Sequence, residues 1–149
     1  MTDISSLAGW LTEEGHELTQ RVYFEDTDFS GFVYHARYLH FLERGRSDYL
    51  RLLGVHHGEL AAEGLAFAVR RMAMEFVQPA RIDDVLTIDT RRGALGGARL
   101  ALRQAIRRDG ELLVEAEVVA VLVNRDGRPR RLPPALRRAL GSGGAAAAL

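Results

Sequence analysis

The chain contains no cysteine and no lysine, and all 20 of its basic residues are arginine. The absence of cysteine excludes disulfides, thiolate metal sites and a cysteine nucleophile. Any chemistry must therefore come from carboxylate, imidazole, hydroxyl or backbone groups. We attribute the exclusive use of arginine to genomic composition, although arginine also suits bidentate contacts to phosphate. The net charge is zero, so no overall field recruits nucleic acid or an anionic membrane.

Several other signals are also missing. No stretch reaches the roughly 18 apolar residues of a membrane span. The first 15 residues lack the basic region and the continuous apolar core of a secretory signal, which predicts a cytoplasmic protein. There is no phosphate-cradling glycine loop and no G-x-S-x-G nucleophile motif. No set of His, Asp and Glu residues has metal-ligand spacing on one element, so we predict neither a metal nor a cofactor.

The length of 149 residues predicts one domain of ordinary size. We expect an N-terminal extension over residues 1–15, the domain itself over residues 16–140, and a disordered, low-complexity tail over residues 141–149. In the extension, four apolar side chains at helical spacing predict a short helix: Ile4, Leu7, Trp10 and Leu11.

The pattern within the domain predicts one long helix followed by a run of strands. The expected strands cover residues 16–24, 66–77, 85–92, 99–108 and 112–123, and the expected helices cover residues 35–53 and 57–63, with a short terminal helix from Pro133. Tight turns between the later strands argue for an antiparallel sheet with helices on one face, an α+β fold. Gly45 costs helix stability, and we expect it where the helix approaches the sheet closely.

The most informative segment covers residues 24–46. Glu25, Asp26 and Asp28 lie within four positions, so that their mutual repulsion could leave one of them as a general base. Gly31 lets the backbone turn sharply, and a helix starts at about His35. The first amides of such a helix could bind an oxyanion. From the spacing alone, an ordinary N-cap is the favoured interpretation.

A family resemblance reverses that preference. The segment resembles the signature of hotdog-fold acyl-CoA thioesterases, in particular the 4-hydroxybenzoyl-CoA thioesterase type and its branch associated with the bacterial Tol-Pal system. The matching residues are Asp26-Thr27-Asp28, Gly31, Val33-Tyr34-His35-Ala36, Tyr38-Leu39, Phe41-Leu42-Glu43-Arg44 and Arg46, with a second match at Asp83-Asp84-Val85-Leu86-Thr87-Ile88. The chain departs from that branch at Phe29-Ser30, where small residues are usual, and at Gly45, where alanine is usual.

The resemblance implies a hotdog fold, in which an antiparallel sheet wraps around a long central helix. It also implies a homodimer, commonly paired again into a homotetramer, with active sites at the subunit interface. In such a site Asp28 would deprotonate water or attack the thioester carbonyl itself, and the backbone near His35 would bind the carbonyl oxygen. The substrate would be an acyl-CoA or the thioester of an acyl-carrier protein.

Further residues are candidates for substrate binding, each with a plain alternative. Tyr34 would line the acyl pocket or simply pack. Glu43 would contact polar substrate or form an ion pair with Arg46. Arg91 and Arg99 flank a turn that could hold the nucleotide end of coenzyme A, or they are ordinary solvated side chains.

Two other functions remain open at this stage. A hotdog hydratase or dehydratase would act on acyl thioesters by proton abstraction at the acyl carbons. A non-catalytic partner of an envelope or lipid-synthesis assembly would keep the fold with a vestigial site. The Asp26-Thr27-Asp28 turn before a helix that bears tyrosine and histidine fits hydrolysis better than the first, and an intact Asp28 and His35 argue against the second.

Overall fold

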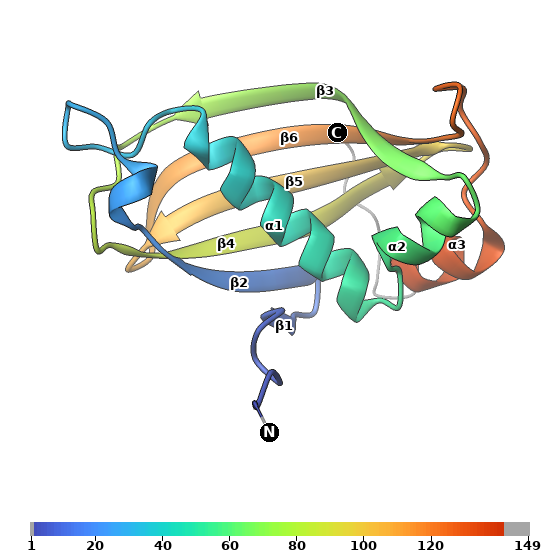
Figure 1. Ribbon diagram of the computed structural model, residues 1–149, viewed down its shortest axis with the longest axis horizontal. Coiled ribbons are helices and arrows are strands. Elements are labelled where there is room, and N and C mark those ends of the chain that lie inside the picture. The colour runs from blue at the N-terminus through green and yellow to red at the C-terminus, as the bar shows by residue number, and fades with distance from the viewer. Residues whose placement is uncertain (1, 142–149) are drawn as a thin grey trace.

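The computed structural model describes residues 2–141 and consists of a six-stranded antiparallel sheet with one long helix across its inner face (Figure 1). The sheet has the strand order β1-β2-β4-β5-β6-β3. Its strands are β1 (Trp10–Leu11), β2 (Gly15–Arg21), β3 (Ala66–Phe76), β4 (Val85–Leu95), β5 (Arg99–Arg108) and β6 (Glu111–Val123). The helices are a 3-10 turn η1 (Phe24–Asp26), α1 (Arg37–Leu52), α2 (His57–Ala62) and α3 (Pro134–Gly141).

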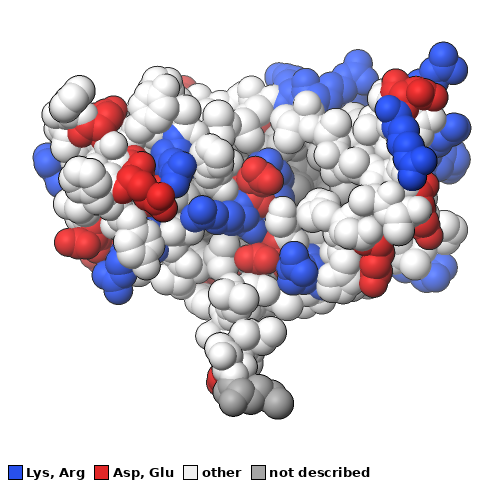
Figure 2. All heavy atoms as spheres, in the orientation of Figure 1, with Lys and Arg blue, Asp and Glu red and all other residues white. Residues whose placement is uncertain are grey.

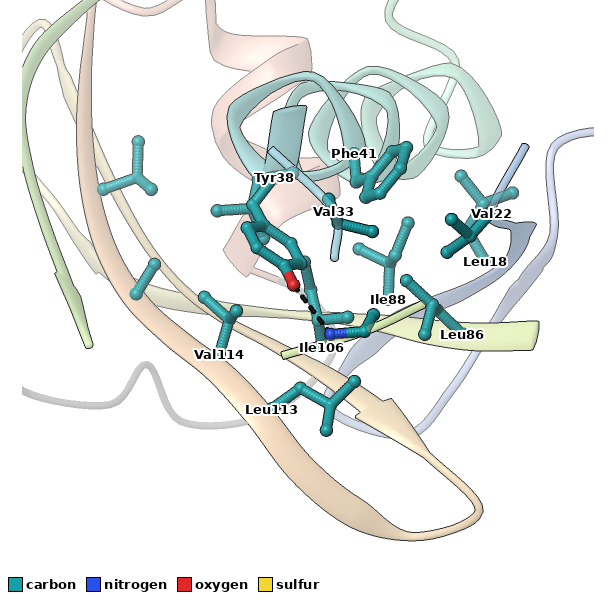
Figure 3. Packing of buried hydrophobic residues seen from close by; sticks show 14 residues of the cluster. Leu18, Val22, Val33, Tyr38, Phe41, Leu86, Ile88, Ile106, Leu113 and Val114 are labelled. Carbon is teal, nitrogen blue, oxygen red and sulfur yellow. Dashed lines mark hydrogen bonds between the residues drawn. The ribbon is translucent and has the colours of Figure 1, made fainter. Parts of the chain in front are cut away.

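Alternation along the strands separates the two faces of the sheet. On β4, Leu86 and Ile88 are fully buried beneath α1, while Asp89 and Arg91 point to the opposite, outer face. Figure 3 shows Tyr38 and Phe41 of α1 packed over this inner face. The core therefore lies on one side of the sheet, beneath α1 as the hotdog resemblance implies, and a second cluster adds Leu60 of α2 and Leu136 and Leu140 of α3.

Gly45 lies where α1 crosses the sheet. A Cβ at this position would lie 2.8 Å from Cγ2 of Ile88 and 3.0 Å from Oγ1 of Thr90. Real Cβ atoms essentially never approach a neighbour so closely as 2.8 Å. The expected use of this glycine is confirmed: it lets the helix approach the sheet.

The N-terminal extension differs from its prediction. Residues Trp10 and Leu11 form strand β1, which pairs with Glu17 and His16 of β2, so the prediction of a short helix is wrong. Gly9 has φ +71, a value that ends any helical run there. The carbonyl oxygen of Ala8 lies 2.6 Å from Nε2 of the buried His16, within hydrogen-bond distance. Hydrogen bonds to the sheet outweigh the helical spacing of the apolar residues.

Other boundaries shift by a few residues. The first strand ends at Arg21 rather than at residue 24, because the chain turns into η1, and α1 begins at Arg37 rather than at His35. The predicted tail lies outside the described residues except for Gly141, which ends α3.

Strand β3 occupies one edge of the sheet and has no neighbour on its outer side among residues 2–141. It is 11 residues long and mostly exposed, with Val69 and Phe76 each about half exposed. Long unprotected edges of this kind are ready templates for pairing with another chain. Within residues 2–141, none of the helices is long and apolar enough to cross a membrane.

Candidate functional site

The segment between η1 and α1 forms a closed loop. The amide of Tyr34 donates to the carbonyl of Asp26 at 2.9 Å, and the amide of Asp28 donates to the carbonyl of Phe32 at 3.1 Å. Gly31 has φ +83, a value that glycine adopts without strain. The loop thus presents Asp28 at the start of its tight turn, where the amide of Gly31 donates to the Asp28 carbonyl at 3.0 Å, and its ends are fixed by backbone hydrogen bonds.

Arg37, in the first turn of α1, forms ion pairs with two of the three carboxylates. Its Nε lies 2.5 Å from Oδ1 of the buried Asp26, and its Nη2 lies 3.5 Å from the exposed Glu25. The second oxygen of Asp26 accepts from the amide of Tyr23 at 2.8 Å. Asp26 and Glu25 are therefore neutralised by Arg37, and Asp26 also holds the backbone at the start of the loop.

Asp28 remains without a cation. No arginine or histidine nitrogen lies within 4 Å of its carboxylate in the described part of the chain. Its Oδ1 instead accepts from the hydroxyl of Ser30 and from the Ser30 amide, the latter at 2.8 Å. These two bonds, with a smaller contribution from His35, lower the pKa of Asp28 below its usual range. Asp28 is an exposed, ionised carboxylate.

The chain between the loop and α1 offers free amides. Within residues 2–141, the backbone N–H groups of His35 and Ala36 have no hydrogen-bond acceptor, because α1 starts only at Arg37 and its N-cap Ala36 makes no side-chain cap. The N-cap interpretation of the acidic turn is therefore wrong. The two amides lie at the positive end of the helix dipole, where an oxyanion would be stabilised.

The side chains of Tyr34 and His35 are exposed and stacked edge to face, with ring centroids 4.8 Å apart. The His35 ring also meets Phe76, at the end of β3, with centroids 6.3 Å apart. Asp28, Tyr34 and His35 thus gather at the end of the molecule where β3 finishes. Tyr34 is not a core residue, since it is 48% exposed.

Glu43 lies two turns further along α1, at the rim of a cavity of about 300 Å³ between α1, α2 and the sheet. The floor is apolar and comes from Leu50, Leu100, Leu102 and Ala120, while Arg46, Ser47 and His57 share the rim. Arg46 donates to Gln104 at 3.1 Å and makes no ion pair with Glu43 within 4 Å. The acidic group of Glu43 therefore remains available at the cavity. Figure 2 shows this face of the molecule.

The structure does not bring Arg91 and Arg99 to this site, and their role in nucleotide binding stays a prediction. Both point to the outer face of the sheet. Arg91 is paired there with Glu14 at 2.6 Å and with Asp89 at 3.4 Å. A larger hollow of about 600 Å³ on that face is lined mainly by charged side chains, which suits an acyl chain poorly.

The second matching motif is structural. Asp84 accepts from the Arg81 amide at 2.8 Å and from Arg108 at 2.7 Å, and its carbonyl accepts from the amide of Val22. Sequence reasoning did not assign roles to Ser30 and Arg37, which set the state of the acidic loop. Ser30 follows Asp28 by two residues, a spacing at which side chains commonly bond to the nearby backbone, so the sequence could have indicated its role. Arg37 follows Asp26 by eleven residues, and no such local pattern indicates that pair.

Chemically, the loop combines an ionised carboxylate with two unsatisfied amides. An amide pair can stabilise the negative charge that develops on a carbonyl oxygen, and a carboxylate can activate water or attack the carbonyl carbon. Among residues 2–141, no three His, Asp or Glu side chains converge as metal ligands would.

Comparison with known proteins agrees with this chemistry. Residues 22–140 match the model of the thioesterase-like superfamily. The Acyl-CoA thioester hydrolase YbgC of Escherichia coli O6:H1 is 44% identical over 118 residues, which cover 78% of this chain and 88% of that protein. The Acyl-CoA thioesterase YbgC of Haemophilus influenzae is 39% identical over 76% of this chain and 85% of its own length.

Solved structures show the same fold. The crystal structure of a probable thioesterase from Bartonella henselae superimposes with a TM-score of 0.78 and is 51% identical, covering 80% of this chain and 99% of that one.

Proposed function

The chain belongs to the thioesterase-like superfamily, and we propose that it hydrolyses the thioester of an acyl-CoA to the free acid and CoA, with Asp28 as the catalytic carboxylate. The relatives named as acyl-CoA thioesterases support the substrate class. One observation carries the assignment of the residue: of the three carboxylates in the turn, only Asp28 lacks a cation within 4 Å, and it interacts electrostatically with His35, whose backbone amide has no acceptor.

In this mechanism, the thioester oxygen accepts from the amide of His35, so that negative charge in the tetrahedral transition state is stabilised. Either water attacks the carbonyl carbon while Asp28 takes its proton, or Asp28 attacks directly and forms an anhydride that water then hydrolyses. In both routes the C–S bond breaks and the thiolate leaves with CoA. The lowered pKa of Asp28 leaves its carboxylate ionised at neutral pH, which is the state that both routes require.

The test measures thiol release from a panel of acyl-CoAs. Asp28→Asn should lower kcat by about 10²–10⁴-fold while the protein stays folded. Glu25→Gln is the matched control, because Glu25 is an exposed acid of the same turn that already pairs with Arg37. Equal activity of Asp28→Asn and the parent would refute the role of Asp28.

The same panel separates the other functions. Hydration of an enoyl-CoA without release of thiol would replace hydrolysis by a hydratase function. If neither CoA thioesters nor acyl-carrier-protein thioesters were hydrolysed or hydrated, the protein would be a non-catalytic partner of an envelope or lipid-synthesis assembly. In a single turnover in ¹⁸O-labelled water, label in the Asp28 carboxylate would establish the anhydride route, because it enters only when water attacks the anhydride at the Asp28 carbonyl. Label in the free acid alone fits both routes, since water attack at the acyl carbon labels the acid in either one.

We further propose that the site is completed by a second copy paired along the β3 edge. A two-fold axis makes two identical edge strands antiparallel. The Phe76 end of one β3, where His35 lies, then faces the Ala66 end of the other. The cavity beside Glu43 opens near that second end, since Phe67 and Ala68 line it. The acyl group would thus occupy the cavity of one copy, while Asp28, His35 and Tyr34 come from its partner.

Mixed dimers test this arrangement. Asp28→Asn chains are mixed and refolded with Ala68→Trp chains, in which the exposed Ala68 position fills the cavity. Neither variant should be active alone. Random exchange gives heterodimers in which one of two sites has both an intact Asp28 and an intact cavity, so about one quarter of the activity should return. No recovery would place both parts of the site in one chain.

A further inference from the structure

The connection after β6 carries an unusual concentration of positive charge. Within residues 124–131, which we term the arginine loop, four of eight residues are arginines: Arg125, Arg128, Arg130 and Arg131. All four are exposed. Among residues 2–141, no carboxylate lies within 4 Å of any of these guanidinium groups. Figure 2 shows basic side chains gathered at this end of the molecule, at the upper right.

The backbone of the arginine loop is held in one conformation. The side-chain oxygen of Asn124 accepts from the amides of Asp126 and Arg128, each at 3.0 Å, and the amide of Arg130 donates to Leu122 at 2.8 Å. Gly127 has φ +77 and closes the turn. Because the backbone is already ordered, a ligand need order only the arginine side chains.

The arginine loop lies beside the start of β3, far from Asp28 of its own chain. Val123, just before the loop, pairs with Ala66, the first residue of β3. His35 lies against Phe76, the last residue of that strand. Eleven residues of strand separate the two ends by about 33 Å, which is longer than the pantetheine arm of CoA. Figure 1 shows the two regions at opposite ends of the molecule.

We propose that the arginine loop of one copy binds the nucleotide phosphates of a CoA thioester whose carbonyl is held at Asp28 of the partner copy. Antiparallel pairing of two β3 edges brings the arginine loop of one chain to the His35 end of the other. The loop then lies near the Asp28 of its partner, although it is far from the Asp28 of its own chain. The inference rests on the proposed hydrolysis and on the second copy. It assigns the CoA end of the substrate to residues other than Arg91 and Arg99.

The chemistry of the loop fits a small phosphate ligand. A guanidinium donates two parallel hydrogen bonds to a phosphate, and CoA carries three phosphate groups. The loop offers no apolar side chain that would enter a membrane, since its other residues are Asn124, Asp126, Gly127 and Pro129. An acidic carrier protein would need a contact area of more than about 1,000 Å², and eight residues supply only part of it.

The experiment compares two substrates with the same acyl group, one on CoA and one on pantetheine, which lacks the nucleotide. In the double variant Arg128→Gln/Arg130→Gln, KM for the acyl-CoA should rise roughly tenfold or more with kcat unchanged. The pantetheine thioester should be hydrolysed as by the parent. Raising the salt concentration should weaken the parent's acyl-CoA binding more than that of the variant.

Arg21→Gln is the control, because Arg21 is an exposed arginine on β2, toward the other edge of the sheet. It should leave both substrates unaffected. An unchanged KM for acyl-CoA in the double variant would overturn the proposal, and so would an equal loss with the pantetheine thioester. Loss confined to an acyl-carrier-protein thioester would replace the nucleotide by a protein partner.

Calorimetric binding of free CoA gives a readout that needs no hydrolysis. The parent should bind CoA, and the double variant should bind it roughly tenfold more weakly. If the parent bound CoA in this way but released no thiol from any substrate, the proposed hydrolysis would fail and the phosphate site would stand. If CoA binding were equal in both proteins, the arginine loop would not be its site.

Discussion

Arg37 donates from Nε to the carboxylate of Asp26 across 2.5 Å, and this pair ties the first turn of α1 to the start of the acidic loop. Asp26 is buried, at 2% exposed, whereas the Arg37 side chain is partly exposed. Asp26 also holds the amide of Tyr23, and its carbonyl holds the amide of Tyr34. The carboxylate of Asp26 thus positions the loop from which Asp28 projects.

Loss of this pair should destabilise the protein. Arg37→Met leaves the Asp26 charge buried without its partner, which typically costs about 3–5 kcal/mol. The free energy of unfolding, measured by urea denaturation, should fall by an amount near the lower end of that range, because Arg37 is partly exposed. The control is Arg51→Met, whose exposed pair with Asp48 spans 3.5 Å and should contribute less than about 1 kcal/mol. Similar losses in both variants would contradict the special role of Arg37.

Removal of the Ser30 hydroxyl should shift the pH dependence of catalysis. The Ser30 bonds lower the pKa of Asp28, and a catalytic carboxylate is active only when ionised. In the parent, kcat/KM should therefore fall only at strongly acidic pH. In Ser30→Ala the pKa of Asp28 rises, so the fall should begin at higher pH. The profile of kcat/KM against pH measures this shift, with circular dichroism at each pH as a check on folding.

Thr27→Ala serves as the comparison for that profile. The Thr27 hydroxyl donates to the carbonyl of Phe24 and does not contact Asp28. In Thr27→Ala, kcat/KM should fall at the same acidic pH as in the parent. If kcat/KM of Ser30→Ala also fell at that pH, the Ser30 hydroxyl would not be the cause of the low pKa of Asp28.

Gly45→Ala should destabilise the fold although alanine favours helices. Helix propensity contributes about 1 kcal/mol in favour of alanine. Against this, the new methyl would press on Ile88 and Thr90 from 2.8 and 3.0 Å, and overpacking costs about 1–3 kcal/mol. We expect a lower midpoint of thermal unfolding. Gly58→Ala in α2, where a Cβ would meet nothing within 4 Å, should instead raise it.

Tyr38→Phe should cost about 1–3 kcal/mol of unfolding free energy. The buried Tyr38 hydroxyl accepts from the amide of Ala80 at 3.0 Å (Figure 3), and phenylalanine would leave that amide unsatisfied. Burial raises the pKa of Tyr38, so the hydroxyl stays neutral well above neutral pH. Tyr23→Phe, at an exposed ring, should change the unfolding free energy by less than about 0.5 kcal/mol.

Most elements of the fold could be predicted from local signals. Glycine and Asp-Gly turns separate the strands, and the apolar spacing from Tyr38 to Leu50 identifies α1, which the structure places at Arg37–Leu52. The N-terminal extension failed because pairing of Trp10 and Leu11 with β2 is a long-range effect. Helical spacing in a short segment does not outweigh such pairing.

The candidate site divides in the same way. The sequence singled out Asp28, Tyr34 and His35, which are near neighbours in the chain and lie together in the structure. It also grouped Arg91 with Arg99, but the side-chain alternation of the strands carries both to the outer face. The arginine loop was not recognised, because only the fold shows that it lies beside the start of β3.

By itself, the sequence determined the family, the order of the strands and α-helices from β2 onward, and the acidic loop before α1, because each depends on residues that are close in the chain. Only the tertiary structure decided which carboxylate is free. Arg37 pairs with Asp26 and Glu25 across a turn of chain, whereas Asp28 has no cation within 4 Å and the hydrogen bonds from Ser30 lower its pKa. Charges interact through space, so their balance is set by distances that sequence spacing does not give.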